Sequence, residues 1–149
     1  MEFETGGPWL ALAVLCEKAI EDKEGRLHLI GILDRLIFTA SGDNAPEAMP
    51  ATVVQVTAVI SFKSGFAKGR YTVGLRPVDP SGLQAQTLTV PILLEGDDRG
   101  ANVILGVNAQ VAEEGLYWFD VLLEQRIVSR IPLRVLYQRT SYGPRPAVG

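Results

Sequence analysis

The sequence predicts an all-β protein in which two antiparallel sheets pack face to face. The first observation is a period of two along residues 114–124, where Tyr117, Phe119 and Val121 fall on one side of the chain. Such alternation is typical of a strand with one face in a core, because successive side chains point to opposite faces. The second observation is that short apolar runs recur about every 8–12 residues with turn signals between them, as in sandwiches and barrels.

The opening of the same stretch indicates the kind of sandwich. Gly115 and Tyr117 resemble the tyrosine corner of immunoglobulin-like domains, where a tyrosine near the start of the penultimate strand bonds to upstream backbone. A second apolar run starts at Ile127 after only Gln125 and Arg126, so the two runs are predicted to pair as a closing hairpin. The predicted fold is therefore an immunoglobulin-like antiparallel β-sandwich of about eight strands.

Residues 8–38 are predicted to form a long hairpin. An apolar run leads to a polar turn at residues 22–25, and the Ile-rich residues 27–38 run back. The first arm, residues 8–21, is also compatible with a helix, since Leu, Ala, Glu and Lys are good helix formers and Pro8 suits a first helical position. The short turn and the β-branched second arm favour a strand.

The middle of the chain is predicted to hold four more strands. Residues 41–50, with one glycine and two prolines, form a connection long enough to cross from one sheet to the other. Pro91 and Pro132 cannot donate a backbone hydrogen bond, which predicts edge strands or bulges at both positions. The predicted strands are 52–62, 71–78, 84–94 and 102–111, separated by turns at 64–69, 79–82 and 95–100.

The chain is predicted to be one domain, residues 1–149, with residues 140–149 as a flexible tail because they show no periodicity. Its N-terminus is acidic, unlike a secretory signal, and the apolar run Trp9–Cys16 is too short to span a membrane. A single Cys also leaves no intrachain disulfide. These observations predict a cytoplasmic protein, and export without a leader is the alternative that they leave open.

No catalytic, cofactor-binding or metal-binding set can be assembled from the sequence. A single Cys and a single His argue against structural zinc and Cys/His catalysis by counting. Cys16 is predicted to be a small buried hydrophobe, and His28, between two leucines, to face solvent. Glu113 and Glu114 are expected to diverge in a turn, and no phosphate-binding glycine loop or Gly-x-Ser-x-Gly motif is present. The protein is therefore predicted not to be an enzyme.

The charge distribution is asymmetric and indicates an interaction surface. Residues 1–125 hold 17 acidic and 9 basic residues, while residues 126–149 hold five arginines and no acid. Arg126, Arg130 and Arg134 share parity, so a regular strand presents them on one outward face. Such a strip either guards an edge strand or docks on acids, in the N-terminal hairpin of the same chain or head-to-tail on a second copy.

Two apolar residues, Trp118 and Leu122, are predicted on the outer face of the closing hairpin, which indicates a face covered by a partner. Nucleic acid is a poor fit for the arginines because the whole chain is acidic, with a net charge of −3. The predicted interaction residues are therefore Trp118, Leu122, Arg126, Arg130 and Arg134.

Several pieces of the sequence together resemble a family of small, uncharacterised bacterial β-sandwich domains of unknown function. They are Leu15-Cys16-Glu17 with the glycine turn after it, residues 29–34 (LIGILD), residues 114–121 (EGLYWFDV) and residues 131–135 (IPLRV). The resemblance implies a compact sandwich and lends no catalytic or binding residue.

Two functions follow as hypotheses. The first is a non-enzymatic β-sandwich that acts as a binding or assembly module and self-associates, with a protein as its partner and neither nucleic acid nor membrane. The alternative is a ligand-binding module for calcium or a carbohydrate, which uses the loops around Asp79 and residues 97–98 at one end of the sandwich.

Overall fold

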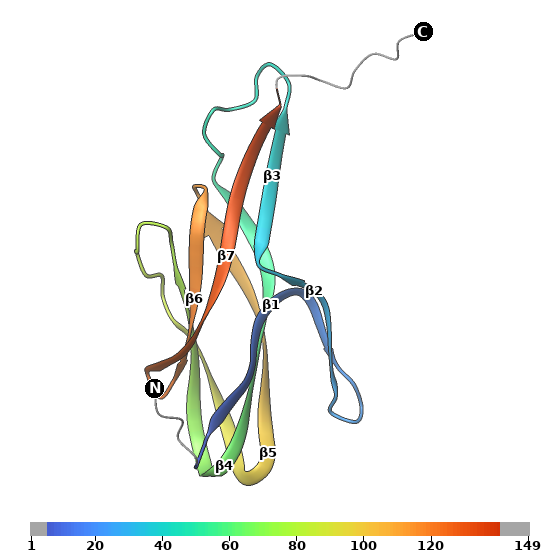
Figure 1. Ribbon diagram of the computed structural model, residues 1–149, viewed down its shortest axis with the longest axis vertical. Coiled ribbons are helices and arrows are strands. Elements are labelled where there is room, and N and C mark those ends of the chain that lie inside the picture. The colour runs from blue at the N-terminus through green and yellow to red at the C-terminus, as the bar shows by residue number, and fades with distance from the viewer. Residues whose placement is uncertain (1–5, 141–149) are drawn as a thin grey trace.

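The computed structural model describes residues 6–140, which form seven strands and no helix (Figure 1). Hydrogen bonds join the strands in the order β2-β1-β4-β6-β7-β3, and β5 lies beside β4. Within these residues no helix is long and apolar enough to cross a membrane. The strands are β1 (Trp9–Glu21), β2 (Leu27–Leu33), β3 (Arg35–Ser41), β4 (Thr52–Val78), β5 (Leu88–Val111), β6 (Gly115–Leu123) and β7 (Arg126–Thr140).

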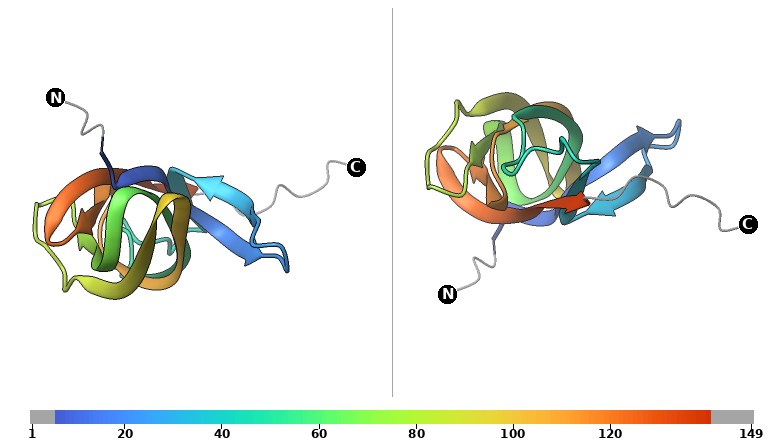
Figure 2. Two further views of the ribbon diagram at one scale, coloured as in Figure 1. Left: turned by 90° about the horizontal axis from the view of Figure 1, so that it is seen from below. Right: turned by 90° about the horizontal axis from the view of Figure 1, so that it is seen from above.

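Two long strands, β4 and β5, contribute to both layers of the sandwich. They pair with each other from Thr52 and Val111 at one end to Leu75 and Leu88 at the other. The first part of β4 also pairs with β1, and its last part pairs with β6. One layer is therefore β2-β1-β4-β5 and the other is β5-β4-β6-β7-β3. The end-on views in Figure 2 show both layers curled around a common interior.

The strands β4 and β5 pass from one layer to the other at a bend near Gly65, at the bottom of Figure 1. The register of β4 against β5 shifts on both sides of Gly65, which lies opposite Asp97. Gly65 has a φ of +59°, a left-handed conformation that residues with a Cβ rarely adopt. A Cβ there would also collide with the Gly6 carbonyl oxygen and lie 2.9 Å from the Trp9 ring. Conformation and space therefore both require glycine at the bend.

Apolar side chains from both layers fill the interior. Tyr117 and Phe119 are only 6% and 1% exposed, so β6 faces the core as its alternation predicts. The Tyr117 hydroxyl donates a hydrogen bond to the Glu113 carbonyl oxygen at 2.7 Å, which confirms the tyrosine corner. The predicted all-β, immunoglobulin-like sandwich is confirmed. Its largest fully buried side chains include Phe62, Phe119, Leu15, Ile60, Leu75, Leu94 and Leu133.

Strand boundaries in the middle of the chain differ from the predicted ones. Residues 64–69 and 95–100, predicted as turns, lie inside β4 and β5 and bend these strands without ending them. The glycines and polar residues there form bulges, which bend a strand and increase its twist. Four predicted strands are therefore two: 52–62 with 71–78 in β4, and the later part of 84–94 with 102–111 in β5, which begins only at Leu88.

Both prolines predicted at edges lie where the sheet has a free side. Pro91 is in β5, which among the described strands pairs only with β4. Pro132 is in β7, on the stretch before Arg134, where pairing with β3 begins. β7 is thus an edge at Pro132 and an internal strand beyond it.

The N-terminal hairpin is shorter than predicted, and its first arm is a strand rather than a helix. β2 ends at Leu33, and β3 continues in the other layer, where it pairs in parallel with β7 from Arg35 opposite Arg134. The predicted second arm, residues 27–38, is therefore divided between the two layers. The sandwich is antiparallel except for this one pair of strands among the described residues.

A two-stranded arm projects from the sandwich at the right of Figure 1. The last pair between β1 and β4 joins Cys16 to Thr57, and beyond it β2 is the one described strand that pairs with β1. We call residues 17–32 the arm. Of the predicted tail, only Thr140 is described, at the end of β7, and residues 141–149 lie outside the described residues.

The bend predicts different costs for two glycine substitutions. Gly65→Ala places a Cβ against backbone in a left-handed conformation, so we expect it to lower the free energy of unfolding by about 3 kcal/mol or more. Gly25→Ala is the control, because Gly25 has a φ of +78° but nothing lies within 4 Å of the place that its Cβ would occupy. It should cost about 1–2 kcal/mol. Urea denaturation measures both, and equal losses would contradict the steric role of Gly65.

Candidate functional site

The outer face of β6 and β7 holds a network of charges around Asp120. Asp120 lies opposite Arg130 across the hairpin, and its side chain is only 3% exposed. Its carboxylate accepts hydrogen bonds from Arg130 Nε at 2.6 Å and from Arg76 Nη2 at 3.0 Å. The Arg130 guanidinium lies over the Trp118 ring, 4.6 Å from its centroid, in a cation–π arrangement. Two predicted interaction residues, Trp118 and Arg130, are thus in contact.

Asp120 is held in its charged form. Burial alone would raise the pKa of Asp120, but the hydrogen bonds and charges of Arg130 and Arg76 outweigh burial and hold that pKa below its ordinary value. The three residues come from β4, β6 and β7, so the network ties three neighbouring strands together. The sequence alone does not join Asp120 to Arg76, because the approach of Arg76 depends on the pairing of β4 with β6.

Leu122 lies on the outer face as predicted but offers little surface to a partner. Its side chain is only 7% exposed. Leu122 lies beside Thr87 over Gly74, a residue of β4 that has no side chain. The segment after β4 therefore comes close to this part of the sheet and helps to cover it. Trp118 is half-buried beneath Arg130.

The predicted strip of three arginines is wrong for Arg126. The pairing of β6 with β7 shifts between Val121 opposite Ser129 and Leu122 opposite Ile127, so Val128 is an extra residue. Such a bulge reverses the side to which the following residues point. Arg126 consequently pairs with Leu123 and points to the side of the sheet that carries the core residues.

Arg130 and Arg134 keep the outer face, and a third arginine joins them. Arg134 pairs with Leu116 of β6 on one side and with Arg35 of β3 on the other. Both arginines of this pair are exposed. Arg35 could not be found from the sequence, because the parallel pairing of β3 with β7 joins segments far apart in the chain.

Four acids of the N-terminal hairpin, Glu17, Glu21, Asp22 and Glu24, lie on the arm, away from β7. Asp22 accepts hydrogen bonds from His28 at 2.8 Å and from Arg26, and Arg26 also pairs with Glu24. The hydrogen bond from His28 is the main cause that lowers the pKa of Asp22 to about 2. Among residues 6–140 no ion pair joins β7 to the arm, so the described chain does not form the predicted internal match.

Three Ile side chains remain exposed on one face of the arm. Ile20, Ile30 and Ile32 are 42%, 51% and 62% exposed. Cys16 at the base of the arm is fully buried, as predicted, and burial raises the pKa of its thiol. His28 is exposed, as predicted, and its bond to Asp22 is additional.

The loops proposed for calcium do not come together. Asp79 follows the end of β4, whereas Asp97 lies opposite Gly65 at the bend, at the other end of the same half of β4. Asp79 Oδ1 already accepts hydrogen bonds from the backbone of Ser81 and Leu83 and from the Ser81 hydroxyl. Across the described chain no group of three or more His, Cys, Asp or Glu side chains is placed to hold a metal ion.

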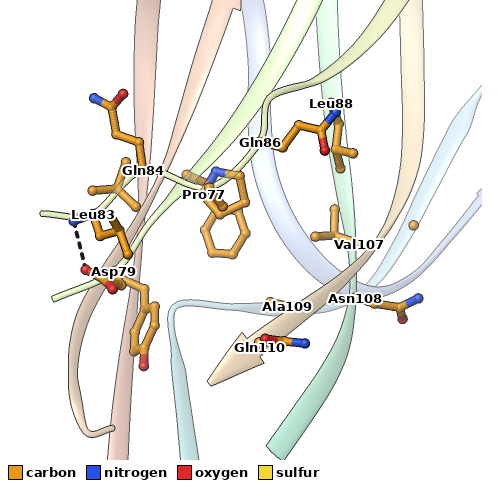
Figure 3. A pocket seen from close by; sticks show the side chains of 15 residues that line it. Pro77, Asp79, Leu83, Gln84, Gln86, Leu88, Val107, Asn108, Ala109 and Gln110 are labelled. Carbon is orange, nitrogen blue, oxygen red and sulfur yellow. Dashed lines mark hydrogen bonds between the residues drawn. The ribbon is translucent and has the colours of Figure 1, made fainter. Parts of the chain in front are cut away.

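A groove opens between the two layers along one side of the sandwich (Figure 3). It has a volume of about 790 Å³ and lies between the segment that joins β4 to β5 and the end of β5. Apolar side chains line its interior, and four carboxamides lie along it. Sequence reasoning missed the groove, because it is formed by the two ends of one long strand brought together by the bend. The lining includes Val78, Leu83, Leu88, Val107, Tyr117 and Phe119, with the carboxamides of Gln84, Gln86, Asn108 and Gln110.

The fold and these surfaces define an immunoglobulin-like β-sandwich with an exposed apolar arm and a lateral groove. A family model with the description "Family of unknown function (DUF6941)" matches residues 11–136, and the chain belongs to this family. The resemblance to an uncharacterised family is thereby confirmed.

Two further comparisons concern solved structures and curated proteins. The chain is similar to a solved structure of a CARDB domain from Pyrococcus furiosus, described in complex with di-metal ions. The two are 10% identical, the match covers 90% of this chain and 100% of that one, and the TM-score is 0.43. No protein with a curated description matches the sequence.

The Asp120 network predicts a large loss of stability on removal of one charge. Asp120→Asn leaves Arg76 and Arg130 without their shared partner, so we expect the free energy of unfolding at pH 7 to fall by about 3 kcal/mol. Because the folded-state pKa is lowered, the network contributes fully above about pH 4 and less as the pH falls through that pKa. The difference between the two proteins should therefore shrink below about pH 4.

Urea unfolding at pH 7, 5 and 3 measures this difference. Glu95→Gln is the control, since it removes one charge from an exposed pair with Arg99 and should change stability by less than about 0.5 kcal/mol. A difference between wild type and Asp120→Asn that stays constant with pH would contradict the depressed pKa.

Proposed function

We propose that the protein is a non-enzymatic assembly module that self-associates through the arm. The observation that carries this proposal is the exposure of Ile20, Ile30 and Ile32 on a hairpin that stands away from the sandwich. A two-stranded hairpin is at best marginally stable in water, and three or more strands or further packing are needed to stabilise it. The arm therefore needs a surface to cover it.

The other face of the arm is also apolar. Ala19 lies opposite Leu29, and both are half-buried, as is Leu27 opposite Glu21. A hairpin with apolar residues on both faces is unusual for a solvated projection, where one face is expected to be polar. This pattern supports the arm as a contact element.

The free edge of β2 lacks the usual protection against pairing. Among the described strands β2 pairs only with β1, and its seven residues include no proline and no Lys, Arg, Asp or Glu. Other edges in the sheet carry such residues, with Pro91 in β5 and Arg35 in β3. Exposed apolar edges without charge or proline are the ones that pair with other chains. The edge of β2 thus favours addition of a further strand.

A second copy of the chain suits this edge better than a charged partner. The arm carries acids and bases in alternation, such as Glu17 with Lys18 and Asp22 with Lys23, so two arms present complementary charges. Antiparallel pairing of two β2 strands would place only His28 among the side chains at the junction that can become charged. The contact is then isologous, and it closes as a dimer with a four-stranded sheet of two arms.

The further parts of the proposal concern chemistry and location. We propose no catalytic role, no nucleic acid and no membrane as partner. In support, Cys16 is fully buried and His28 is bonded to a carboxylate of its own hairpin. We also propose the cytoplasm as the place of action, which suits a protein whose one thiol is unpaired.

Self-association is tested by light scattering behind gel filtration. We expect the wild type to show twice the mass of one chain at high protein concentration and to keep that mass at high salt, because the contact is apolar. Ile32→Lys, at the most exposed position of the arm's three Ile side chains, should give a monomer.

Val53→Lys is the control for this experiment. Val53 in β4 is 61% exposed, so it receives the same change at nearly the same exposure on the body of the sandwich, and its variant should stay dimeric. A monomeric wild type at all concentrations, or a dimer lost at high salt, would contradict association through the arm. The second result would favour the arginines of the outer face instead.

A further inference from the structure

We propose that the groove binds an extended, uncharged segment of polypeptide, which adds as a strand to the free edge of β5 at residues 106–110. This site is distinct from the arm, which lies on the other edge of its layer. The proposal depends on the free edge, the apolar interior and the carboxamides.

The first wall of the groove is a sheet edge with unused backbone groups. Residues 106–110 of β5 pair on one side with residues 53–57 of β4 and with no described strand on the other. Gly106 has no side chain, and nothing lies within 4 Å of the place where its Cβ would be. A strand edge at a glycine, with no side chain to crowd it, allows another backbone to approach closely. This edge can therefore donate to and accept from an added strand.

The opposite wall is an irregular segment that leaves the other layer of the sandwich. After β4 ends, the backbone N–H of Ala85 donates to the Pro77 carbonyl oxygen at 2.8 Å, and Gln84 forms a single bridge with Val78. Leu83 on this segment is 70% exposed, and Leu88, where β5 begins, is 37% exposed. The segment thus presents apolar side chains to the groove without closing it, as Figure 3 shows.

The interior of the groove selects apolar side chains of alternate residues. Val107 is 3% exposed and lies on the core side of β5, and Phe119 and Tyr117 of β6 form the depth of the groove. An added strand would point every second side chain at these residues and the others at the rim, since strands alternate with a period of two. Val, Ile or Thr at the inward positions matches such a surface.

The rim selects an uncharged occupant. Gln84, Gln86, Asn108 and Gln110 offer carboxamides, which both donate and accept hydrogen bonds and match the amides of a peptide. Among the described residues that line the groove, Asp79 is the one carboxylate. Hydrogen bonds from two residues of its own turn already occupy one of its oxygens, and the bond from the Ser81 side chain is the main cause of its lowered pKa. Lysine or glutamate at an inward position would lose its hydration against the apolar walls, which costs free energy.

The test uses the blocked peptide acetyl-Thr-Val-Thr-Val-Thr-Val-Thr-amide and a matched peptide with Lys in place of each Val. Each is titrated into the isotope-labelled full chain, and amide shifts are followed residue by residue. We expect the Val peptide to perturb amides of residues 84–88 and 106–110 and to bind at least about tenfold more tightly than the Lys peptide. Shifts confined to 27–33 would place binding on the edge of the arm and overturn the groove proposal.

Two variants of β5 test whether the peptide binds in the groove or elsewhere along this strand. Ala109→Trp fills the groove at a half-buried position and should weaken binding of the Val peptide at least about tenfold. Ile104→Trp places the same ring at a 39% exposed position outside the groove lining and should leave binding unchanged. Both variants are first compared with the wild type by urea unfolding. Equal binding by all three proteins, or no binding of the Val peptide, overturns the proposal.

Discussion

The bend that carries β4 and β5 from one layer to the other is the constraint on which the rest of the structure depends. A sheet can fold over on itself only where the backbone turns sharply and no side chain blocks the approach. Gly65 meets both conditions, since it is left-handed and packed against Gly6 and Trp9. The hairpin of β4 and β5 belongs to both layers. The first part of β4 pairs with β1 in one layer, and the last part pairs with β6 in the other, so this one hairpin determines the position of both strands.

The two layers end in edges of different character. The edge formed by β3 and β7 is basic, with Arg35 beside Arg134, and the edge formed by β5 contains a proline and borders a groove. The edge formed by β2 is apolar and projects on the arm. The arginines disfavour unwanted pairing at the edge of β3 and β7. The free backbone groups of β2 and β5 are then the edges that remain for specific contacts. The proposed assembly and the proposed peptide groove therefore use different edges of one sheet.

Patterns local to one strand are visible in the sequence, and patterns between strands are not. The alternation around Tyr117 and Phe119 predicts the buried face of β6, and the Gly-x-Tyr signal predicts a hydrogen bond to upstream backbone, which in the structure is the Glu113 carbonyl oxygen. The bulge at Val128 reverses the expected side of Arg126, because one extra residue cannot be recognised without its partner strand. The groove is invisible for the same reason, since its walls meet only after the bend has formed. The glycine-containing polar stretches 64–69 and 95–100 predict turns, although both lie inside strands. A bend within a strand uses the same residue types as a turn between two strands, so the sequence does not distinguish them.

The parallel pairing of β3 with β7 has a consequence for the order in which the protein matures. β3 is the third strand to leave the ribosome, and its neighbour β7 is the seventh. Until β7 is synthesised, Leu36 and Phe38 of β3 have no sheet to hold them, although both finally pack against the core. Contacts between such distant segments slow folding, since a long loop must close before they form. For most of the synthesis of the chain, β3 is therefore unpaired and its apolar side chains are exposed. This is the interval in which a chaperone would bind the nascent chain.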